Sequence, residues 1–312
     1  MEKTAGKPIR CRAAVCRKPG EALVIEEIEV APPKAYELRI KILCTSLCHS
    51  DVTFWRMPTS PVSIFPRIFG HEAVGVRENV TDVKVGEIVV PVFLANCEYC
   101  RDCKSNKSNT CTSLPFSSAP GMPRDGTSRF TGSSGETLHN FLGVGCFSEY
   151  TVVDIAYVAK VSPEMPIDKA CLLSCGYASS CFSVDDFDVI KEMTDGGADY
   201  CFECIGLASL MNDAFSSCRD GWGKTIILGV EMHGAPLSIN TYELLKGKRI
   251  EGSLFGGIKA KTDIPLLAQS YLNKELHLNE FITHEIDFED INTAFDLLIQ
   301  GKSLRCIIWM NK

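Results

Sequence analysis

Short apolar runs separated by turn residues fill the first half of the chain. Val, Ile and Leu dominate these runs, and Pro and Gly bound them, as at Pro19-Gly20 and Lys84-Val85-Gly86. This pattern is typical of an antiparallel β domain. The predicted strands cover residues 13–16, 23–30, 37–44, 88–93 and 148–153. We therefore expect the chain up to about residue 157 to form a barrel-like β domain whose loops carry the chemistry.

The last third of the chain has an α/β rhythm instead. Two β-rich apolar runs, 198–205 and 223–230, end at or near Gly, as buried parallel strands do. Residues 208–218 between them form the predicted crossover helix, and Thr262 or Asp263 is the expected N-cap of a later helix. The other predicted elements are a strand end at 251–257, helices at 262–275 and 290–300 before Gly301, and a closing strand at 303–310.

The composition is that of a globular protein with about two domains. The chain has 312 residues, of which 45% are hydrophobic, and a formal net charge of −7. Nucleic acids and anionic membranes select basic surfaces, so neither is an expected partner. Residues 1–10 lack the apolar core of a secretory signal, and no stretch has the ~18 apolar residues of a membrane span. We therefore expect a cytoplasmic protein.

Four cysteines lie close together, in the spacing Cys97-x2-Cys100-x2-Cys103-x7-Cys111. The residues around them are polar, so a hydrophobic core cannot order this segment. A tetrahedral Zn²⁺ held by four thiolates can, because metal-binding energy becomes folding energy in such loops. An iron–sulfur cluster is one alternative, although bacterial ferredoxins bring the fourth Cys after three residues. Disulfides are the other, although 16 cysteines in a cytoplasmic chain favour reduced thiols.

Three further residues suggest a second metal site. Cys48 lies in Cys48-His49-Ser50-Asp51, His71 lies in Gly70-His71-Glu72, and Cys175 precedes Gly176 after an apolar run. Two thiolates and one imidazole are the ligand choice of a catalytic zinc, which leaves a fourth position for water or substrate. Each residue alone is more often a packed or solvated side chain, so the prediction depends on their combination with the four-cysteine loop.

In its motifs the chain resembles the zinc-dependent medium-chain alcohol dehydrogenases, and in particular plant alcohol dehydrogenase-like proteins. The resemblance covers nearly the whole chain. Its motifs, beyond those quoted above, are Asp125-Gly126-Thr127-Ser128-Arg129-Phe130, Phe202-Glu203-Cys204-Ile205-Gly206, Ser253-Leu254-Phe255-Gly256-Gly257 and Leu304-Arg305-Cys306. It implies a mixed α/β fold. A GroES-like antiparallel β-barrel catalytic domain would cover 1–176 and a C-terminal return 257–312, with an incomplete Rossmann-type parallel sheet at 177–256.

The resemblance also implies a role for each residue that matches a family motif. Cys48, His71 and Cys175 match the catalytic-zinc ligands, and the four-cysteine loop matches the structural-zinc ligands, which implies two zinc ions per chain. The residues matched to the reaction are Ser50, which takes the alcohol proton, and the orienting carboxylates Asp51 and Glu72. The residues matched to coenzyme binding are His49 and Arg305 at the pyrophosphate, with Ile205, Val230 and Phe255. The residues matched to the substrate pocket are Phe93, Phe141 and Leu142.

The implied reaction is oxidation of a primary or secondary alcohol to an aldehyde or ketone, with hydride transfer to NAD. Zinc makes the alkoxide available near neutral pH, and Ser50 passes the proton outward. Thr53 stands where many members have a His at the outer end of this relay, so we expect slower proton release. The implied partners are a small alcohol or aldehyde and a second subunit, in a homodimer or in a heterodimer with an intact paralogue.

The chain departs from the family between Ser180 and Asp186. The family has there the first Rossmann strand, the G-x-G-x-x-G turn, its helix and a second strand with an acidic end, and this chain has none of them. A smaller gap lies at 74–79. Without the Gly-rich turn the pyrophosphate loses its backbone N–H partners, so we expect impaired activity. The alternatives are a non-catalytic zinc-binding remnant that associates with an intact paralogue, and a chain that does not fold.

Overall fold

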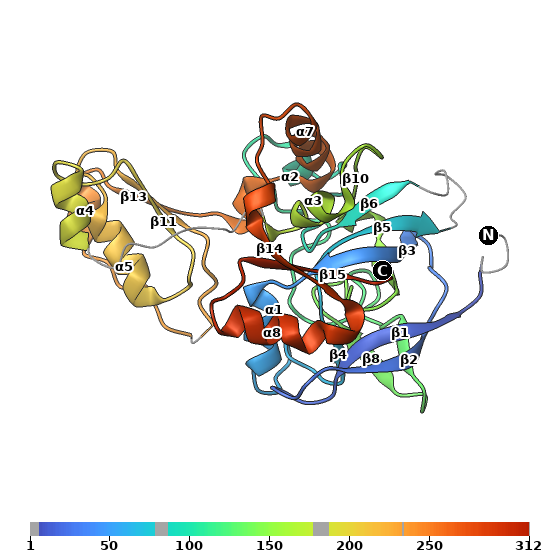
Figure 1. The fold of residues 1–312 in the computed structure, drawn as a ribbon. Coiled ribbons are helices and arrows are strands. Elements are labelled where there is room, and N and C mark those ends of the chain that lie inside the picture. The colour runs from blue at the N-terminus through green and yellow to red at the C-terminus, as the bar shows by residue number, and fades with distance from the viewer. Residues whose placement is uncertain (1–5, 79–86, 177–186, 233, 312) are drawn as a thin grey trace. The chain divides into compact units, whose positions relative to one another are not determined.

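The computed structural model describes residues 6–78, 87–176, 187–232 and 234–311 (Figure 1). The chain divides into two compact units. The first unit contains Met1–Tyr177 and Ile258–Lys312, and the second contains Ala178–Gly257. The sequence junction between Ser180 and Asp186 lies outside the described residues.

A closed β-barrel forms one part of the first unit, and the predicted strands at 13–16 and 23–30 lie in it, whereas those at 37–44, 88–93 and 148–153 lie in a second sheet. The strands of the barrel, in order, are β1 (Ile9–Cys16), β2 (Val24–Val30), β7 (Phe130–Gly132), β8 (Thr137–Asn140) and β4 (Arg67–Ile68). Neighbouring strands are antiparallel, except that β4 and β8 are parallel.

A second sheet of the first unit carries most of the predicted site residues. Its strands, in order, are β10 (Val158–Lys160), β6 (Ile88–Pro91), β5 (Glu72–Glu78), β3 (Glu37–Ser46), β15 (Arg305–Trp309) and β14 (Ile282–Asp287), while β9 (Tyr150–Asp154) also pairs with β3. In the register of these strands Ser46 lies opposite both Glu72 and Ile307. Three segments that are far apart in the sequence therefore meet at the end of β3.

The described helices of the first unit are α1 (His49–Arg56), α2 (Arg101–Lys104), α3 (Ile167–Leu172), α7 (Ala260–Leu272) and α8 (Ile291–Ile299), with 3₁₀ turns η2 (Ile155–Tyr157), η5 (Asn279–Phe281) and η6 (Phe288–Asp290). Helix α8 confirms the helix predicted at 290–300. It buries Ile291, Ala294 and Leu298 on one face, as their helical spacing predicts. Gly301 ends the helix in a left-handed conformation, with φ 68°.

Two predicted boundaries are wrong. Helix α7 has Lys259 as its N-cap rather than Thr262 or Asp263. The Asp263 carboxylate instead accepts a hydrogen bond from the Lys259 backbone N–H at 2.8 Å, so it caps the helix from inside the first turn. The strand end predicted at 251–257 also fails, because β13 stops at Gly252 and η4 (Leu254–Gly257) is a turn in which Phe255 and Gly256 have positive φ.

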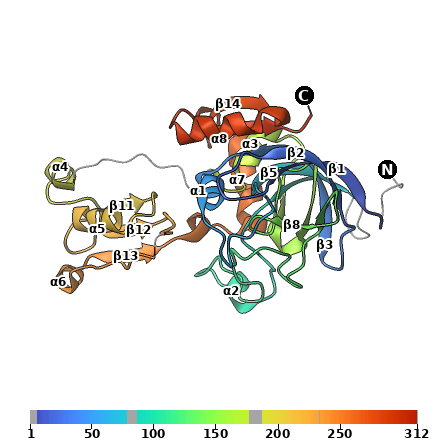
Figure 2. The ribbon, with the colours of Figure 1, turned by 90° about the horizontal axis from the view of Figure 1, so that it is seen from below.

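The second unit is built on three parallel strands in the part of the chain that the structure describes. Their order is β11 (Tyr200–Glu203), β12 (Lys224–Ile227) and β13 (Arg249–Gly252), and the helices are α4 (Phe187–Met193), α5 (Ala208–Ser217) and α6 (Thr241–Leu245) (Figure 2). Helix α5 connects β11 to β12 and packs on both. Strand β11 is an edge strand, and its Tyr200 and Phe202 are 61% and 56% exposed. These strands form the incomplete Rossmann-type sheet that the sequence predicts.

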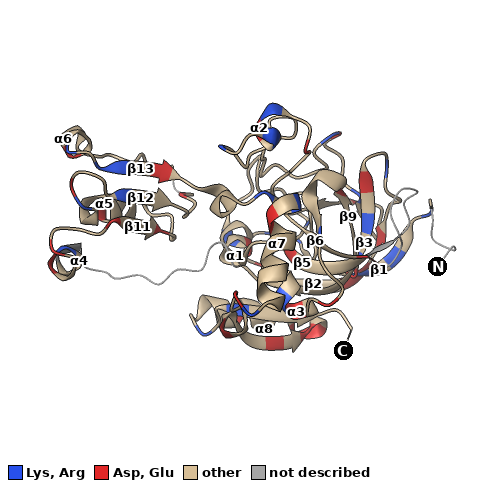
Figure 3. Cartoon of the chain, turned by 90° about the horizontal axis from the view of Figure 1, so that it is seen from above, with Lys and Arg blue, Asp and Glu red and all other residues tan. Residues whose placement is uncertain are grey.

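Basic and acidic residues are mixed along the elements of the chain (Figure 3). On β1, for example, Arg10 pairs with Glu27 and Arg12 pairs with Glu149. None of the described helices is both long enough and apolar enough to cross a membrane.

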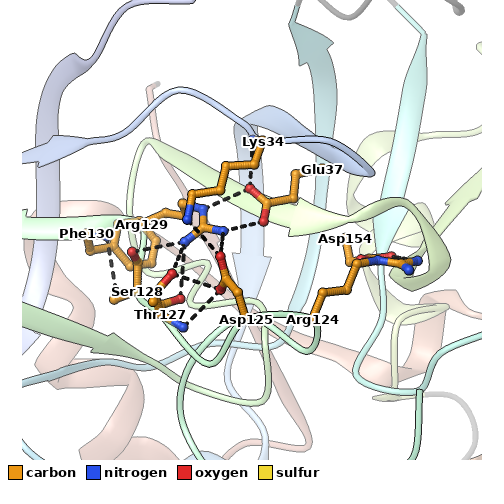
Figure 4. Close-up of polar contacts among 9 residues, drawn as sticks. All are labelled: Lys34, Glu37, Arg124, Asp125, Thr127, Ser128, Arg129, Phe130 and Asp154. Atoms are coloured by element: carbon orange, nitrogen blue, oxygen red, sulfur yellow. Dashed lines mark hydrogen bonds and ion pairs between the residues drawn. The ribbon is translucent and has the colours of Figure 1, made fainter. Parts of the chain in front are cut away.

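An ion cluster around the buried pair of Arg129 and Glu37 fastens the loop before β7 to the start of β3 (Figure 4). The Arg129 guanidinium binds both carboxylate oxygens of Glu37, with Nε 2.8 Å from Oε2, and also lies 2.9 Å from Asp125. Lys34 reaches Asp125 at 2.8 Å. The hydrogen bond from Lys34, with others from Thr127 and Arg129, holds the pKa of the Asp125 carboxyl well below its usual range.

Replacing Arg129 by Met should lower the free energy of unfolding by about 3–5 kcal/mol, because Glu37 would stay buried without a counter-charge. Urea unfolding followed by circular dichroism measures this. The matched control is Arg10→Met, since the Arg10 side chain is 75% exposed and its pair with Glu27 spans 3.6 Å. Such a surface pair contributes about 0–1 kcal/mol. Equal losses in the two variants would contradict the role given to the cluster.

The stabilising effect of Asp125 should depend on pH. A carboxyl whose pKa is lowered by folding stabilises the native state above its ordinary pKa of about 4, and this stabilisation is lost as the pH falls through the folded value. The difference in unfolding free energy between the native sequence and Asp125→Asn should therefore be largest near about pH 7 and shrink below about pH 4. Urea unfolding at several pH values checks this, and a difference that does not change with pH would refute it.

Candidate metal centres and active site

The four-cysteine loop brings its sulfurs together in the geometry of a single metal ion. Sγ of Cys97 lies 3.8 Å from that of Cys103, and Sγ of Cys100 lies 4.0 Å from that of Cys111. A tetrahedral shell with metal–sulfur bonds of about 2.3 Å separates its sulfurs by about 3.8 Å. A disulfide needs about 2.05 Å, and no disulfide joins the described cysteines. The loop therefore fits one tetrahedral ion, whereas in a four-iron cluster each thiolate would bind a different iron.

Backbone N–H groups point at the sulfurs of this loop. The amides of Cys100, Cys103 and Leu114 lie 3.3–3.4 Å from the sulfurs of Cys97, Cys100 and Cys111 respectively. Burial opposes ionisation of Cys100, but the N–H groups of Cys103 and Thr112 outweigh it and lower the pKa of this thiol to about 5. Backbone N–H groups thus favour the thiolate of Cys100, the form that binds a metal, whereas burial raises the pKa of Cys103 to about 12 while no metal is bound.

The loop is also fastened to the residues that precede α7. Lys259 Nζ donates to the carbonyl oxygens of Cys103, at 3.0 Å, and of Ser105. Asn109 Nδ2 donates to the carbonyl of Ile258 at 3.2 Å. The four-cysteine loop therefore holds the chain where it re-enters the first unit.

The second predicted ligand set also comes together. Cys48 precedes α1, His71 precedes β5 and Cys175 follows α3, and one donor atom of each, with a carboxylate oxygen of Glu72, lies within 4.8 Å of the others. All four side chains are buried. His71 Nδ1 lies 3.3 Å from Asp51 Oδ2, so Nε2 is the ring nitrogen left for a metal.

Neighbouring groups favour the thiolate form of Cys48. The pKa of Cys48 lies well below its ordinary value, chiefly because the Cys175 thiol donates a hydrogen bond to it, with help from His71 and Arg305. Two sulfurs and one imidazole nitrogen are a donor set that zinc accepts, and they leave a fourth tetrahedral position open. The residues present therefore fit the metal that the sequence predicts.

Asp51 connects the two segments that carry Cys48 and His71. Its carboxylate accepts hydrogen bonds from the backbone N–H of Gly70 at 2.9 Å and of Cys48 at 3.2 Å. Gly70 has φ 89°, and a Cβ there would lie 2.5 Å from the Phe147 ring, so a larger residue would displace the segment that carries His71.

The other residues that the family resemblance matched to the reaction and to coenzyme binding lie at different places in the structure. Ser50 Oγ lies 3.8 Å from Cys48 Sγ, and His49 is exposed. Arg305 is 6% exposed and lies 3.4 Å from Glu72, with a second contact to the carbonyl of Gly176. Three of the predicted coenzyme contacts belong to the second unit, namely the exposed Ile205 and Val230 and the buried Phe255.

Aromatic side chains surround the ring of His71. Its centroid lies 5.8 Å from that of Phe93 and 5.5 Å from that of Phe141, and Leu142 follows Phe141 as a buried residue. The structure adds Phe116, which the sequence analysis missed and which meets the Phe93 ring edge-on at 6.1 Å. No spacing signal marks Phe116, because it lies in an irregular loop.

The comparisons with known proteins agree with this geometry. Residues 34–163 match the alcohol dehydrogenase GroES-like domain, and residues 169–271 match the zinc-binding dehydrogenase domain. Alcohol dehydrogenase-like 1 of Arabidopsis thaliana is 50% identical, with 100% of both chains covered. An alcohol dehydrogenase of Malus domestica is 39% identical, also with 100% of both chains covered.

Solved structures share the fold. An alcohol dehydrogenase zinc-binding domain protein from Burkholderia ambifaria superposes with a TM-score of 0.85 at 22% identity, covering 98% of this chain and 100% of that one. Benzyl alcohol dehydrogenase from Acinetobacter calcoaceticus gives a TM-score of 0.83 at 20% identity, covering 97% of this chain and 100% of that one.

The alignment with the Arabidopsis relative is longer than this chain. It spans 388 positions, whereas this chain has 312 residues, so at least 76 positions have no residue here. The identity and coverage are nevertheless far above what establishes common descent. The chain belongs to the zinc-binding alcohol dehydrogenase family.

Proposed function

We propose that this chain is a zinc-dependent alcohol dehydrogenase with two complete zinc sites and a weakened site for NAD. The observation that carries the proposal is the grouping of Cys48, His71 and Cys175 in one buried site, beside an independent four-thiol loop. The first set leaves one tetrahedral position for an alcohol or aldehyde oxygen, and the second is closed.

The residues of the first site divide the work of alcohol oxidation. Cys48, His71 and Cys175 would hold the zinc, which supplies Lewis-acid polarisation of the alcohol oxygen when bound. Asp51 keeps His71 in the tautomer with Nε2 free. Ser50 stands next to Cys48 and accepts the alcohol proton, and the rings of Phe93 and Phe141 exclude water from the apolar part of the substrate.

Thr53 offers a poor continuation of the proton path. Its hydroxyl donates to the carbonyl of His49 at 3.0 Å, within helix α1. A hydroxyl bonded in this way is less available to relay a proton than the His that many family members carry there. Proton release to solvent should therefore be slow in this chain.

The weakness of the NAD site follows from the missing residues. In a dinucleotide-binding fold the pyrophosphate rests on backbone N–H groups of a Gly-rich turn at the start of a helix. The sequence contains no G-x-G-x-x-G motif. Loss of two charge-assisted hydrogen bonds, at about 1.5–3 kcal/mol each, weakens affinity about 100-fold or more.

A non-catalytic role is the second candidate, and the exposed edge of the second unit favours it. Tyr200 and Phe202 on β11 leave apolar surface in water. Such an edge pairs readily with another chain. In this role the chain binds zinc and associates with an intact paralogue without turning over alcohol.

Purified protein should contain two zinc ions per chain by inductively coupled plasma mass spectrometry. Cys175→Ser and Cys111→Ser should each reduce the content to one, because each removes a ligand from a different site. Cys111→Ser should also lower the melting temperature more, since the polar loop has no core to order it. Cys11→Ser, which changes a buried thiol outside both sites, should keep two zinc ions. One zinc or none in the native sequence would overturn the assignment of Cys48, His71 and Cys175.

Titration of NADH fluorescence should show binding at least about 100-fold weaker than that of an intact plant relative measured in parallel. Turnover of ethanol should be correspondingly slow. Tight NADH binding with rapid turnover would refute the weakened coenzyme site. Two bound zinc ions without any NADH binding would favour the non-catalytic role, which size-exclusion chromatography after co-expression with an intact paralogue then tests.

A further inference from the structure

Ser46 makes a buried hydrogen bond that no sequence motif predicts. It is the last residue of β3 and lies opposite Glu72, the first residue of β5. Both side chains are fully buried. Ser46 Oγ donates to Glu72 Oε2 at 2.6 Å, while Arg305 Nε lies 3.4 Å from the same oxygen. The hydroxyl is therefore the nearer of the two groups on this oxygen.

The other carboxylate oxygen of Glu72, Oε1, accepts no comparable hydrogen bond within the described structure. Oε1 is buried and has no hydrogen-bond partner among the described residues. A carboxylate oxygen of Glu72 lies within 4.8 Å of the donor atoms of Cys48, His71 and Cys175. An unpaired buried carboxylate oxygen is unfavourable, and a bound zinc ion is a strong partner for it. Without a restraint, Glu72 would compete with substrate for the fourth position on the metal.

We propose that Ser46 is a positioning residue of the catalytic metal centre. Its hydroxyl holds Glu72 Oε2 toward β3 and keeps the carboxylate off the metal, so that the fourth position stays open to the alcohol oxygen. This inference rests on the proposed function, because it requires a metal at Cys48, His71 and Cys175.

The packing around Glu72 supports a specific role for this hydroxyl. A Cβ added to Gly176 would lie 2.7 Å from Arg305 Nε and 3.2 Å from Glu72 Oε2. Position 176 must therefore be glycine for Arg305 and Glu72 to lie side by side here. When the Ser46 hydroxyl is removed, the 3.4 Å contact with Arg305 Nε is the one of the two contacts on Oε2 that remains.

The test replaces zinc by Co²⁺, whose visible absorption reports the number and type of its ligands, and uses imidazole as a probe for the open position. In the native sequence imidazole should bind to the Co²⁺ protein and shift its spectrum. Ser46→Ala should weaken imidazole binding about tenfold or more, because the carboxylate takes the fourth position. The double variant Ser46→Ala/Glu72→Gln should recover native imidazole affinity. Ser46→Thr, which keeps the hydroxyl, should resemble the native protein.

Two further variants separate positioning from general stability. Ser148→Ala removes another fully buried hydroxyl, one that bonds only backbone carbonyls in the described structure, and it should leave spectrum and imidazole affinity unchanged. Glu72→Gln alone should keep the native spectrum, because the carboxylate is off the metal in the native chain. If Ser46→Ala fails to fold, a changed spectrum in Glu72→Gln would still overturn the inference.

The outcomes distinguish this inference from the proposed function. If the native chain takes up no Co²⁺ at the site of Cys48, His71 and Cys175, the proposed function fails and the role of Ser46 fails with it. If Co²⁺ binds and Ser46→Ala retains native imidazole affinity, the role of Ser46 alone is overturned. A changed spectrum in Glu72→Gln also overturns it, because the carboxylate would then be a ligand of the native site. Co²⁺ in the four-cysteine loop gives the same background in every variant.

Discussion

The buried carboxylate of Asp51 joins the two segments that supply the first ligands of the candidate active site. A fully buried charge has no water to stabilise it, so protein donors must do so. Here the amide of Cys48, the amide of Gly70 and the ring of His71 supply those interactions. Loss of the carboxylate would leave the two amides unsatisfied and remove the 3.3 Å contact of His71 Nδ1, and it would free both ligand segments at once. The tautomer of His71, the start of α1 and the tight turn at Gly70 all depend on this one side chain.

Both metal sites could be predicted from the sequence. The ligands of one are close together in the chain, and those of the other belong to distinctive family motifs. The spacing of Cys97, Cys100, Cys103 and Cys111 brings the sulfurs together on a short loop whatever the rest of the fold does. Cys48, His71 and Cys175 are distant in sequence, and here the family resemblance supplied what spacing could not. The structure brings both sets together.

Other features depend on register and packing, which the sequence pattern does not show. Ser46 meets Glu72 only because β3 and β5 pair with these two residues opposite each other. Phe116 reaches Phe93 from a loop without periodicity. The start of α7 was misplaced because Asp263 is a favoured N-cap residue, yet it satisfies the backbone of Lys259 from within the helix. The preference of Asp for helix N-termini therefore indicated the position of the helix but not its first residue.

The hydrogen bonds that Lys259 and Asn109 donate make the order of the four-cysteine loop matter for a neighbouring segment. They attach the loop to the residues at which the chain returns from the second unit. A loop that loses its metal has no apolar core to keep its shape, so the carbonyls that receive Lys259 disperse as well. Zinc binding in the loop is therefore thermodynamically coupled to the order of the residues just before α7.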